Sequence, residues 1–380
     1  NACTITLPSV ATAGDQIILV DYARTWGTNA ITIDSNGLNF QSSDDSYIVD
    51  YDTAGQALNL VYSGATVGWT PSSDIVNALE PVAPSIQRGI FAFGNVGGSN
   101  TGVSNLMNSS GVIATDVAAV GTAHNAGSSC SYGGDKAIFG FGDAGGLTGI
   151  TNLVNNSGVI ASNVAAVGTA RAGINAASYD GSNKGIFFGG QTSGVTAISN
   201  LVSTSGVVAS DTSAVSGVTA RRFSAGASFG GDRAIFAYGR DGGSNGLSMS
   251  NLVSNSGVIA SDVTGVGTAR ISLAAVGYGG DKAVFAYGEN TSSNALVNTR
   301  NLVSNIGVVA ADATGAGTAR NALGAAPYGG DKGAFGFGYI AEEASNLKTL
   351  VSNTGVVSAD VTGVGTARYY TSGAGYSFSA

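Results

Sequence analysis

The sequence predicts an all-β protein in which a small N-terminal β domain precedes a six-bladed β-propeller. Three observations lead to this prediction. A unit of 48 to 50 residues repeats, and residues 251–270 and 301–320 are identical at 15 of 20 positions. Each copy holds four short segments rich in β-branched and aromatic residues, separated by Gly, Asn and Asp. No stretch shows a sustained helical period, and four strands per repeat of this length are typical of propeller blades.

Six equivalent phenylalanines fix the number of repeats. They are separated by 48, 48, 49, 49 and 50 residues, and they are Phe91, Phe139, Phe187, Phe236, Phe285 and Phe335. In the copy that follows Arg270, we expect strands at residues 271–278, 282–287, 301–304 and 308–311. The turns between them are the Gly-Gly-Asp of residues 279–281 and residues 305–307.

The two ends of the repeat region complement each other. The first copy starts at Arg88 without a first strand, and residues 369–378 form a first strand without a second. We therefore expect the C-terminal strand to complete the blade that begins near residue 88. This pairing closes the ring and removes two exposed sheet edges.

Residues 1–70 lie outside the repeat and predict the separate β domain, with strands at residues 3–7, 16–20, 30–33, 48–51, 58–62 and 67–69. The domain holds both tryptophans, and a unit this short is rarely stable alone, so we expect it to oligomerise. Residues 71–87 contain Pro71, Pro81 and Pro84 and are interpreted as a linker, with a short helical turn within residues 73–79. The propeller then spans residues 88–380.

Composition excludes several classes of partner. The net charge is −8 and no basic stripe is present, so nucleic acid is a poor partner. No apolar run approaches the length of a membrane span, and we expect no membrane insertion. Cys3 and Cys130 lie in different regions and are expected to be unpaired.

Catalytic and metal chemistry find little support in the sequence, and we expect no enzyme activity and no cofactor. The single histidine, His124, occupies the position that holds an arginine in the other repeats, which indicates a structural role. One His and two separated Cys cannot build a zinc or copper site. The remaining enzymatic alternative is a depolymerase that acts through carboxylates such as Asp241, Glu342 or Glu343.

Two periodic sets of polar residues admit a structural and a functional interpretation. The arginines after each repeat are Arg171, Arg221, Arg270, Arg320 and Arg368. Their partners are Asp116, Asn163, Asp211, Asp262, Asp312 and Asp360. We favour tethers between blades over a ring that binds an anionic ligand.

Asp44, Asp45, Asp50 and Asp52 cluster in the N-terminal domain, and solvated loop carboxylates are favoured there over a calcium site.

The candidate binding residues lie in the loops between the second and third strands of the blades. These loops differ in length and charge between copies, whereas the turns at the opposite ends of the strands are nearly constant. Variable loops on a rigid scaffold are where recognition is usually placed, although neutral drift of tolerant loops is the alternative. The candidates are Asn95, Asn100, Gln191, Arg240, Asp241, Asn245, Glu289, Asn290, Asn294, Tyr339, Glu342 and Glu343.

Two parts of the chain resemble known families. Leu7-Pro8, Asp21-Tyr22 and the segment from Tyr62 to Trp69 resemble a β-structured module of bacteriophage tail and virion fibre proteins. That resemblance implies a homotrimer that contacts other virion proteins. The repeats resemble kelch repeats, and their YGGDKAIFGFG and NLVSNSGV motifs are similar to those of phage-encoded proteins. They lack the usual Trp of kelch repeats, and the glycine doublet is clear only at Gly189-Gly190.

The sequence therefore leads to an expected function. We expect a fibre or spike subunit of a phage virion, exposed to the extracellular medium, whose propeller binds a host-surface glycan or protein for adsorption. The alternative is a non-enzymatic decoration protein of the capsid.

Overall fold

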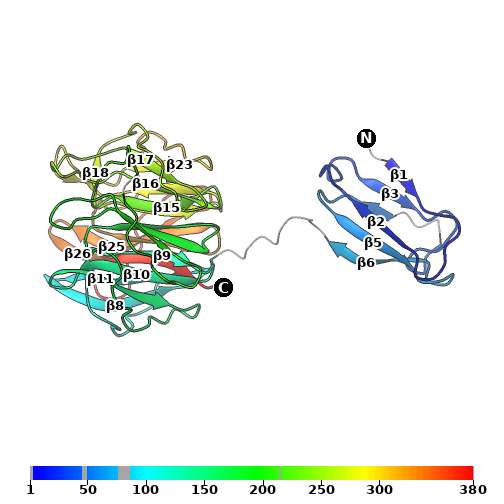
Figure 1. The fold of residues 1–380 in the computed structure, drawn as a ribbon, viewed down its shortest axis with the longest axis horizontal. Helices are drawn as coiled ribbons and strands as arrows, with labels where there is room; N and C mark the ends of the chain where they lie inside the picture. Colours follow the sequence, from blue (N-terminus) through cyan, green and yellow to red (C-terminus); the bar gives the residue numbers. More distant parts are fainter. Residues whose placement is uncertain (1–2, 45–48, 76–85, 214, 380) are drawn as a thin grey trace. The chain divides into compact units, whose positions relative to one another are not determined.

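The computed structural model describes residues 3–44, 49–75, 86–213 and 215–379, and in these residues it contains β-strands and no helix. The predicted all-β class is therefore confirmed (Figure 1). None of the described residues forms a helix that could cross a membrane. The chain divides into two compact units, Asn1–Val82 and Ala83–Ala380, which we describe separately.

The first unit contains two three-stranded sheets. In one sheet the first two strands are parallel and the third is antiparallel, in the order β1 (Cys3–Thr6), β3 (Ile31–Asp34) and β4 (Val49–Tyr51). The other sheet is antiparallel throughout, in the order β2 (Gln16–Val20), β5 (Ala57–Tyr62) and β6 (Trp69–Ile75). Five of the six strands lie close to their predicted positions, and β6 extends further.

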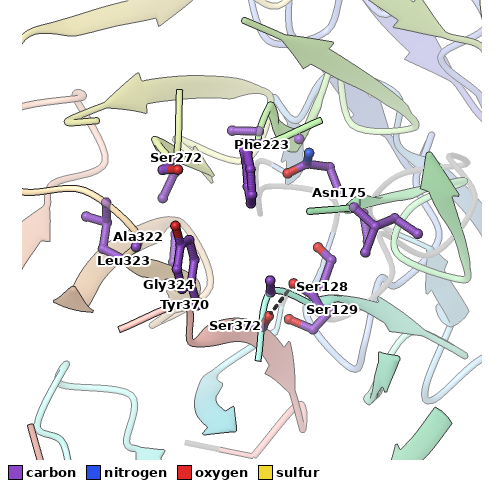
Figure 2. Close-up of a pocket in the computed structure, with 18 of the residues that line it drawn as sticks. Ser128, Ser129, Asn175, Phe223, Ser272, Ala322, Leu323, Gly324, Tyr370 and Ser372 are labelled. Carbon is purple, nitrogen blue, oxygen red and sulfur yellow. Dashed lines mark hydrogen bonds between the residues drawn. The ribbon is translucent and has the colours of Figure 1, made fainter. Parts of the chain in front are cut away.

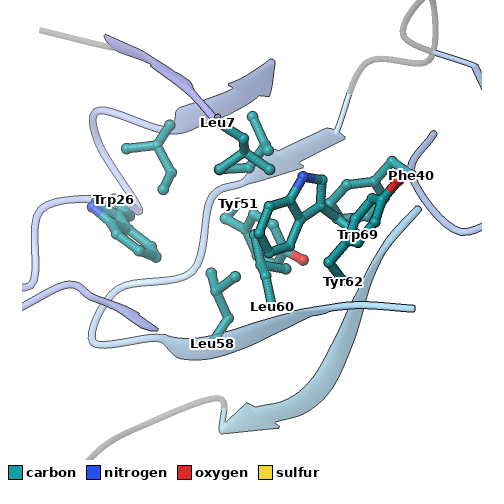
Figure 3. Close-up of a cluster of buried hydrophobic side chains, with 10 residues drawn as sticks. Leu7, Trp26, Phe40, Tyr51, Leu58, Leu60, Tyr62 and Trp69 are labelled. Atoms are coloured by element: carbon teal, nitrogen blue, oxygen red, sulfur yellow. The ribbon is translucent and has the colours of Figure 1, made fainter. Parts of the chain in front are cut away.

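Both sheets of the first unit contribute to one hydrophobic core (Figure 3). In β5, Leu58, Leu60 and Tyr62 are buried at alternate positions, as expected for a strand with one face covered. Trp69 is 1% exposed and packs edge-on against Tyr62, with 5.4 Å between ring centroids. A unit of this size buries little surface, so this aromatic core is expected to supply most of its stability.

The extent of β6 corrects the predicted linker. Residues 71–75 belong to this strand, and Pro71 pairs with Leu60 beside a register shift. Proline is tolerated there because β6 is the edge strand of its sheet and the ladder is already interrupted at the shift. The helical turn expected at residues 73–79 is wrong for residues 73–75, and its remainder lies outside the described residues, as do Pro81 and Pro84.

The second unit contains six equivalent three-stranded antiparallel sheets in its described residues. The first strands are β27 (Ser372–Tyr376), β9 (Ser128–Tyr132), β12 (Asn175–Tyr179), β15 (Ala225–Phe229), β19 (Ala274–Tyr278) and β24 (Gly324–Tyr328). The second strands are β7 (Arg88–Val96), β10 (Lys136–Asp143), β13 (Lys184–Phe188), β16 (Arg233–Ala237), β20 (Lys282–Ala286) and β25 (Lys332–Ile340). The third strands are β8 (Ser99–Met107), β11 (Leu147–Val154), β14 (Ser199–Val202), β17 (Ser250–Val253), β23 (Arg300–Val303) and β26 (Glu343–Val351). A further small sheet joins β18 (Arg270–Ile271), β21 (Glu289–Asn290) and β22 (Ala295–Leu296).

The fourth segment of each repeat is not the regular strand that the sequence predicts. It contacts the third strand through isolated bridges such as Val303↔Val309 and Arg300↔Ala313. Between these bridges, the Asn301 side-chain amide donates to the Ala310 carbonyl. A side chain thus takes the place of ladder hydrogen bonds, which interrupts the strand without leaving the carbonyl unpaired.

The C-terminal strand pairs as the sequence predicts. β27 runs antiparallel to β7, with Ser372 opposite Ala92 and Tyr376 opposite Arg88. The first strands of the six sheets also contact one another in cyclic order, from β9 through β12, β15, β19, β24 and β27 back to β9. The equivalent phenylalanines of the second strands are at most 1% exposed and form the cores between neighbouring sheets.

Each second strand separates two sets of loops. At its beginning, the Gly-Gly-Asp turn contacts the turn before the fourth segment, where Asn156 Nδ2 donates to Asp135 Oδ2 over 3.2 Å. We call this end the turn face. At the other end, the loop to the third strand pairs with the connection between sheets, through bridges such as Asn95↔Tyr369 and Asn321↔Tyr339. We call this end the loop face, and it carries the candidate binding residues.

Candidate binding face

The periodic arginines lie inside the second unit and cannot reach a ligand. All five have no exposed surface, and each guanidinium lies over an aromatic ring at 3.8 to 5.3 Å from its centroid. Arg171 donates from Nε to the Gly189 carbonyl and from Nη2 to Asn200 Oδ1. Burial lowers the pKa of Arg171 to about 10, so the side chain remains charged at neutral pH. These contacts support the tether interpretation.

The acidic partners hold the connection of the preceding repeat. Asp211 accepts hydrogen bonds from the backbone nitrogen and the hydroxyl of Thr169, at 3.0 and 2.6 Å, and from Asn200 Nδ2 at 2.9 Å. Partial burial alone raises the pKa of Asp211, but these hydrogen bonds outweigh it and the pKa is lowered. Asp116 makes the same contacts to Thr366, which ties the last connection to the first sheet.

His124 takes the arginine position with a neutral ring. It is 2% exposed and stacks on Phe93, with 4.0 Å between ring centroids. Its Nδ1 lies 3.0 Å from the Thr122 carbonyl, and burial lowers its pKa. The ring is therefore part of the packing between sheets and is not placed to bind a metal or a substrate.

A central cavity of about 100 Å³ is lined by the starts of all six first strands. Its rim on the loop face is formed by six residues whose φ lies between 50° and 63°, in the left-handed region. Backbone nitrogens join five consecutive pairs of them, for example Phe223 N to the Gly173 carbonyl and Tyr370 N to the Ala322 carbonyl. The rim residues are Ala126, Gly173, Phe223, Ser272, Ala322 and Tyr370.

Two aromatic side chains meet at this rim. Phe223 and Tyr370 project toward the middle of the cavity and stack on each other, with centroids 5.9 Å apart and an interplanar angle of 25° (Figure 2). Both rings are half-buried. A cavity of about 100 Å³ is smaller than a typical ligand pocket of roughly 300–1,000 Å³, so a ligand of sugar size must lie on the rim rather than inside.

The Tyr370 hydroxyl lies among polar groups from several sheets. Burial raises the pKa of Tyr370, the charges of Glu289 and Tyr369 raise it further, and Ser272 and Arg222 lower it. Tyr369 in turn packs against Tyr339, with 4.9 Å between ring centroids. The loop face around the rim thus carries aromatic rings together with hydroxyl, carboxylate and guanidinium groups.

The structure places several predicted residues beside this rim, where they contact the connections between sheets. Glu289 Oε2 accepts a hydrogen bond from Asn321 Nδ2 at 3.0 Å. Asn100 Nδ2 donates to the Asp143 carbonyl at 2.8 Å and so joins the loops of two neighbouring sheets. Asn95 is 7% exposed, and its backbone pairs with Tyr369. Gln191 and Arg240 pair in the same way with the connections before their sheets.

The other predicted residues lie in the loops between the second and third strands. Within the described part of the chain, no hydrogen bond or strand pairing joins them to a connection between sheets, except that Asn290 pairs with Arg270. Asp241 accepts two hydrogen bonds from Asn245, which lower its pKa. Asn290 caps its own loop by accepting from Ser292 N. The last three are exposed at loop tips and are Asn294, Glu342 and Glu343.

Sequence reasoning missed the residues on the connections between sheets. They immediately follow the periodic arginine position, and they differ between repeats while that position holds arginine in all repeats but the one with His124. That contrast between neighbouring positions is a signal that could have found them. The missed residues are Asn125, Arg222, Phe223, Asn321, Tyr369 and Tyr370.

The acidic cluster of the first unit shows no metal-binding arrangement in the described residues, which bring no three His, Cys, Asp or Glu side chains together. Asp50 accepts a hydrogen bond from Thr32 Oγ1 at 2.7 Å. Asp45 lies outside the described residues. Both cysteines are free, as predicted: Cys3 is exposed and Cys130 is buried.

Comparison of the sequence with protein-family models and with curated proteins gives no match in either case.

Proposed function

We propose that the second unit is a closed six-bladed, kelch-like propeller and that its loop face recognises a molecule on a host cell. The propeller is supported by the cyclic contacts of the first strands and by the β27–β7 pairing. Six aromatic residues that end the first strands add to this support, because each packs against a turn glycine of the next sheet. Tyr376 contacts Gly158 in this way, and Tyr328 contacts Gly111 across the junction between last and first repeats.

The recognition proposal depends on one observation, the cluster of aromatic and polar side chains at and beside the rim. Tyr339, Tyr369, Tyr370 and Phe223 gather on the loop face, together with amide and charged groups. Aromatic rings beside a few well-placed polar groups are the usual composition of a small-molecule or glycan site. Together with the resemblance of the N-terminal module, this favours a fibre or spike subunit of a phage virion that binds a host-surface glycan.

The titratable groups of the second unit favour a binding function over a catalytic one. Burial raises the pKa of the Cys130 thiol to about 12, which makes it a poor nucleophile. His124 is buried against Phe93. The carboxylates considered for a depolymerase lie on two different loops, where Asp241 is bonded to Asn245 and Glu342 and Glu343 are exposed.

We propose that the first unit forms the homotrimer and attaches to other virion proteins. Its edge strand β2 directs Ile18 and Val20 to solvent, 67% and 52% exposed, beside the 96% exposed Tyr22. An edge strand with an exposed apolar face favours association with further copies of the same chain. An Ile18→Lys, Val20→Lys variant should be monomeric in sedimentation analysis, with wild-type circular dichroism. A wild-type monomer at virion-like concentration would contradict this assignment.

Binding of the full chain to an array of bacterial surface polysaccharides tests the recognition proposal. We expect at least one polysaccharide to bind, and a Tyr339→Ser, Tyr369→Ser variant to lose about tenfold or more in affinity, since each ring contributes contact area on the loop face beside the rim. Lys332→Ser on the turn face is the matched control and should bind as wild type. If no polysaccharide and no bacterial cell binds, or if the Tyr339→Ser, Tyr369→Ser variant binds as wild type, the proposal is wrong.

A capsid decoration role remains as the second candidate, and a belt of exposed valines favours it. The same position of every fourth segment carries a valine that is 55% to 63% exposed. Such a belt suits lateral packing on a protein shell. If particles without this protein adsorb normally but lose stability, decoration is the better assignment. The valines are Val112, Val159, Val207, Val258, Val308 and Val356.

A further inference from the structure

Two arginines of the loop face lie directly opposite each other. Arg222 precedes the rim residue Phe223, and Arg240 follows the second strand of the same sheet. Their backbones exchange two hydrogen bonds, Arg222 N to the Arg240 carbonyl over 3.0 Å and the reverse over 2.9 Å. Residues paired in this way project their side chains to the same side of the two-stranded ribbon. Like charges in such a pair are destabilising, so the pair calls for a counterion.

Neither guanidinium has an acidic partner within 4.0 Å among the described residues, in contrast to the ion pairs Arg171–Asp211 and Arg320–Asp360. The Nε atoms of Arg222 and Arg240 are buried and have no hydrogen-bond partner in the described part of the chain. Buried donors are normally paired. The tether arginines Arg221, Arg270 and Arg320 also have an unpaired Nε, but they have no exposed surface, whereas Arg222 and Arg240 are partly exposed on the loop face.

Two carboxylates of the loop face already have hydrogen-bond partners. Asp241 follows Arg240 in sequence, but its Oδ1 accepts from Asn245 N at 2.8 Å and its Oδ2 from Asn245 Nδ2 at 3.0 Å. Glu289, on the next sheet, accepts from Asn321. Neither carboxylate forms an ion pair with Arg222 or Arg240 within 4.0 Å in the described part of the chain.

The arginine pair adjoins the aromatic rim. The Arg222 guanidinium lies 5.2 Å from the centroid of Phe223, and Phe223 stacks on Tyr370. This cation–π contact fixes Arg222 at the edge of the rim without neutralising it. A positive subsite is thus continuous with the surface on which a sugar ring can rest.

We infer that Arg222 and Arg240 form an anion subsite of the loop face and that its ligand is an acidic saccharide. An oxyanion on the sugar, either a carboxylate or a phosphate, accepts hydrogen bonds from both guanidinium groups. The sugar to which it belongs lies against the Phe223 and Tyr370 rim. The inference rests on the proposed recognition function and specifies the class of its ligand.

Ligand-observed NMR titration of the full chain tests the subsite with three probes: glucuronic acid, glucose 6-phosphate and neutral glucose. We expect at least one acidic probe to saturate and glucose not to bind. Saturation by glucuronic acid alone identifies a uronic acid ligand, and saturation by glucose 6-phosphate alone identifies a phosphorylated one. Arg222→Gln and Arg240→Gln should each weaken binding about tenfold or more, since each removes a charge-assisted contact.

Controls separate the subsite from a general charge effect and from loss of structure. Arg233→Gln changes net charge equally on the turn face of the same sheet, where Arg233 pairs with Asp232, and should leave acidic-sugar binding unchanged. Arg240→Gln should not lower the melting temperature, because it relieves a like-charge pair. A markedly lowered melting temperature would instead assign these arginines a structural role and overturn the inference.

The outcome also separates this inference from the proposed function. If a neutral polysaccharide binds the rim and the Arg222→Gln variant binds it as tightly as wild type, the recognition face stands and the anion subsite is wrong. If both acidic probes fail to saturate, or bind the variants as well as wild type, the subsite is also wrong. If no polysaccharide of any charge binds, both are wrong.

Discussion

Replacing Tyr376 by alanine tests whether β27 closes the second unit in solution. Tyr376 is 1% exposed and packs with Ile90 and Phe139, which belong to two different sheets. Truncating a buried aromatic side chain costs about 3–5 kcal/mol of unfolding free energy. Tyr179 occupies the equivalent position in β12 and is 2% exposed, so Tyr179→Ala measures the same loss away from the junction. We expect the two variants to lose similar amounts.

Urea denaturation with two probes measures this loss in the correct unit. The only two tryptophans, Trp26 and Trp69, lie in the first unit, so their fluorescence reports that unit alone. Far-UV circular dichroism is dominated by the larger second unit. We therefore expect Tyr376→Ala to shift the circular dichroism transition and to leave the tryptophan transition in place.

The result that refutes the reasoning is a difference between the two positions. If Tyr376→Ala costs less than about 0.5 kcal/mol while Tyr179→Ala costs the full amount, β27 is not packed against β7 in solution. Tyr376→Phe serves as the conservative control and should cost less than about 1.5 kcal/mol, because it keeps the buried ring.

Three further predictions concern the contacts between sheets and the thiols. Asp211→Ala should lower stability by about 1–3 kcal/mol, whereas Asp211→Asn should cost less, because Asn163 makes the equivalent contact to Thr122. The folded pKa of Asp211 lies below its ordinary value of 3.8. The contribution of Asp211 to the unfolding free energy is therefore fully present above pH 3.8 and is lost as the pH falls through the folded pKa. Acid titration followed by circular dichroism will show this loss. Gly206→Ala should destabilise the second unit by about 1 kcal/mol or more, because φ is +79° and a Cβ would lie 2.8 Å from the Tyr132 ring. Gly194→Ala is the control, because an added Cβ would meet nothing within 4 Å, and it should leave the thermal melting temperature unchanged. A thiol reagent should label Cys3 in the folded protein and Cys130 only after unfolding, and rapid labelling of both would contradict the burial of Cys130.

The order of strands was predictable because the repeat supplies its own alignment. The spacing of Phe91 and its equivalents located the second strands, and the missing first strand before Arg88 predicted the pairing of β27. The fourth strand was not predictable, because apolar valines indicate a strand whether or not a side chain such as Asn301 interrupts the ladder. The linker prediction failed at Pro71 because proline excludes only a central, regular strand position.

The candidate site was predictable in its location but not in its centre. Variation in loop length indicated the loop face and placed Glu289 and Tyr339 on it. Phe223 and Tyr370 escaped notice because their placement depends on a left-handed backbone, with φ of 52° and 50°. Bulky residues rarely adopt that conformation, so their residue type gives no hint of it. The surrounding hydrogen bonds between consecutive rim residues hold the backbone there.

The pairing of β27 with β7 has a consequence for synthesis on the ribosome. Ala374 must find Ile90, which leaves the exit tunnel 284 residues earlier. At translation rates of roughly 5–20 residues per second, β7 waits for about 14–57 s with one edge unprotected. During that interval the nascent chain offers an open template to other polypeptides, and we expect chaperone occupancy to be highest on this part of the molecule.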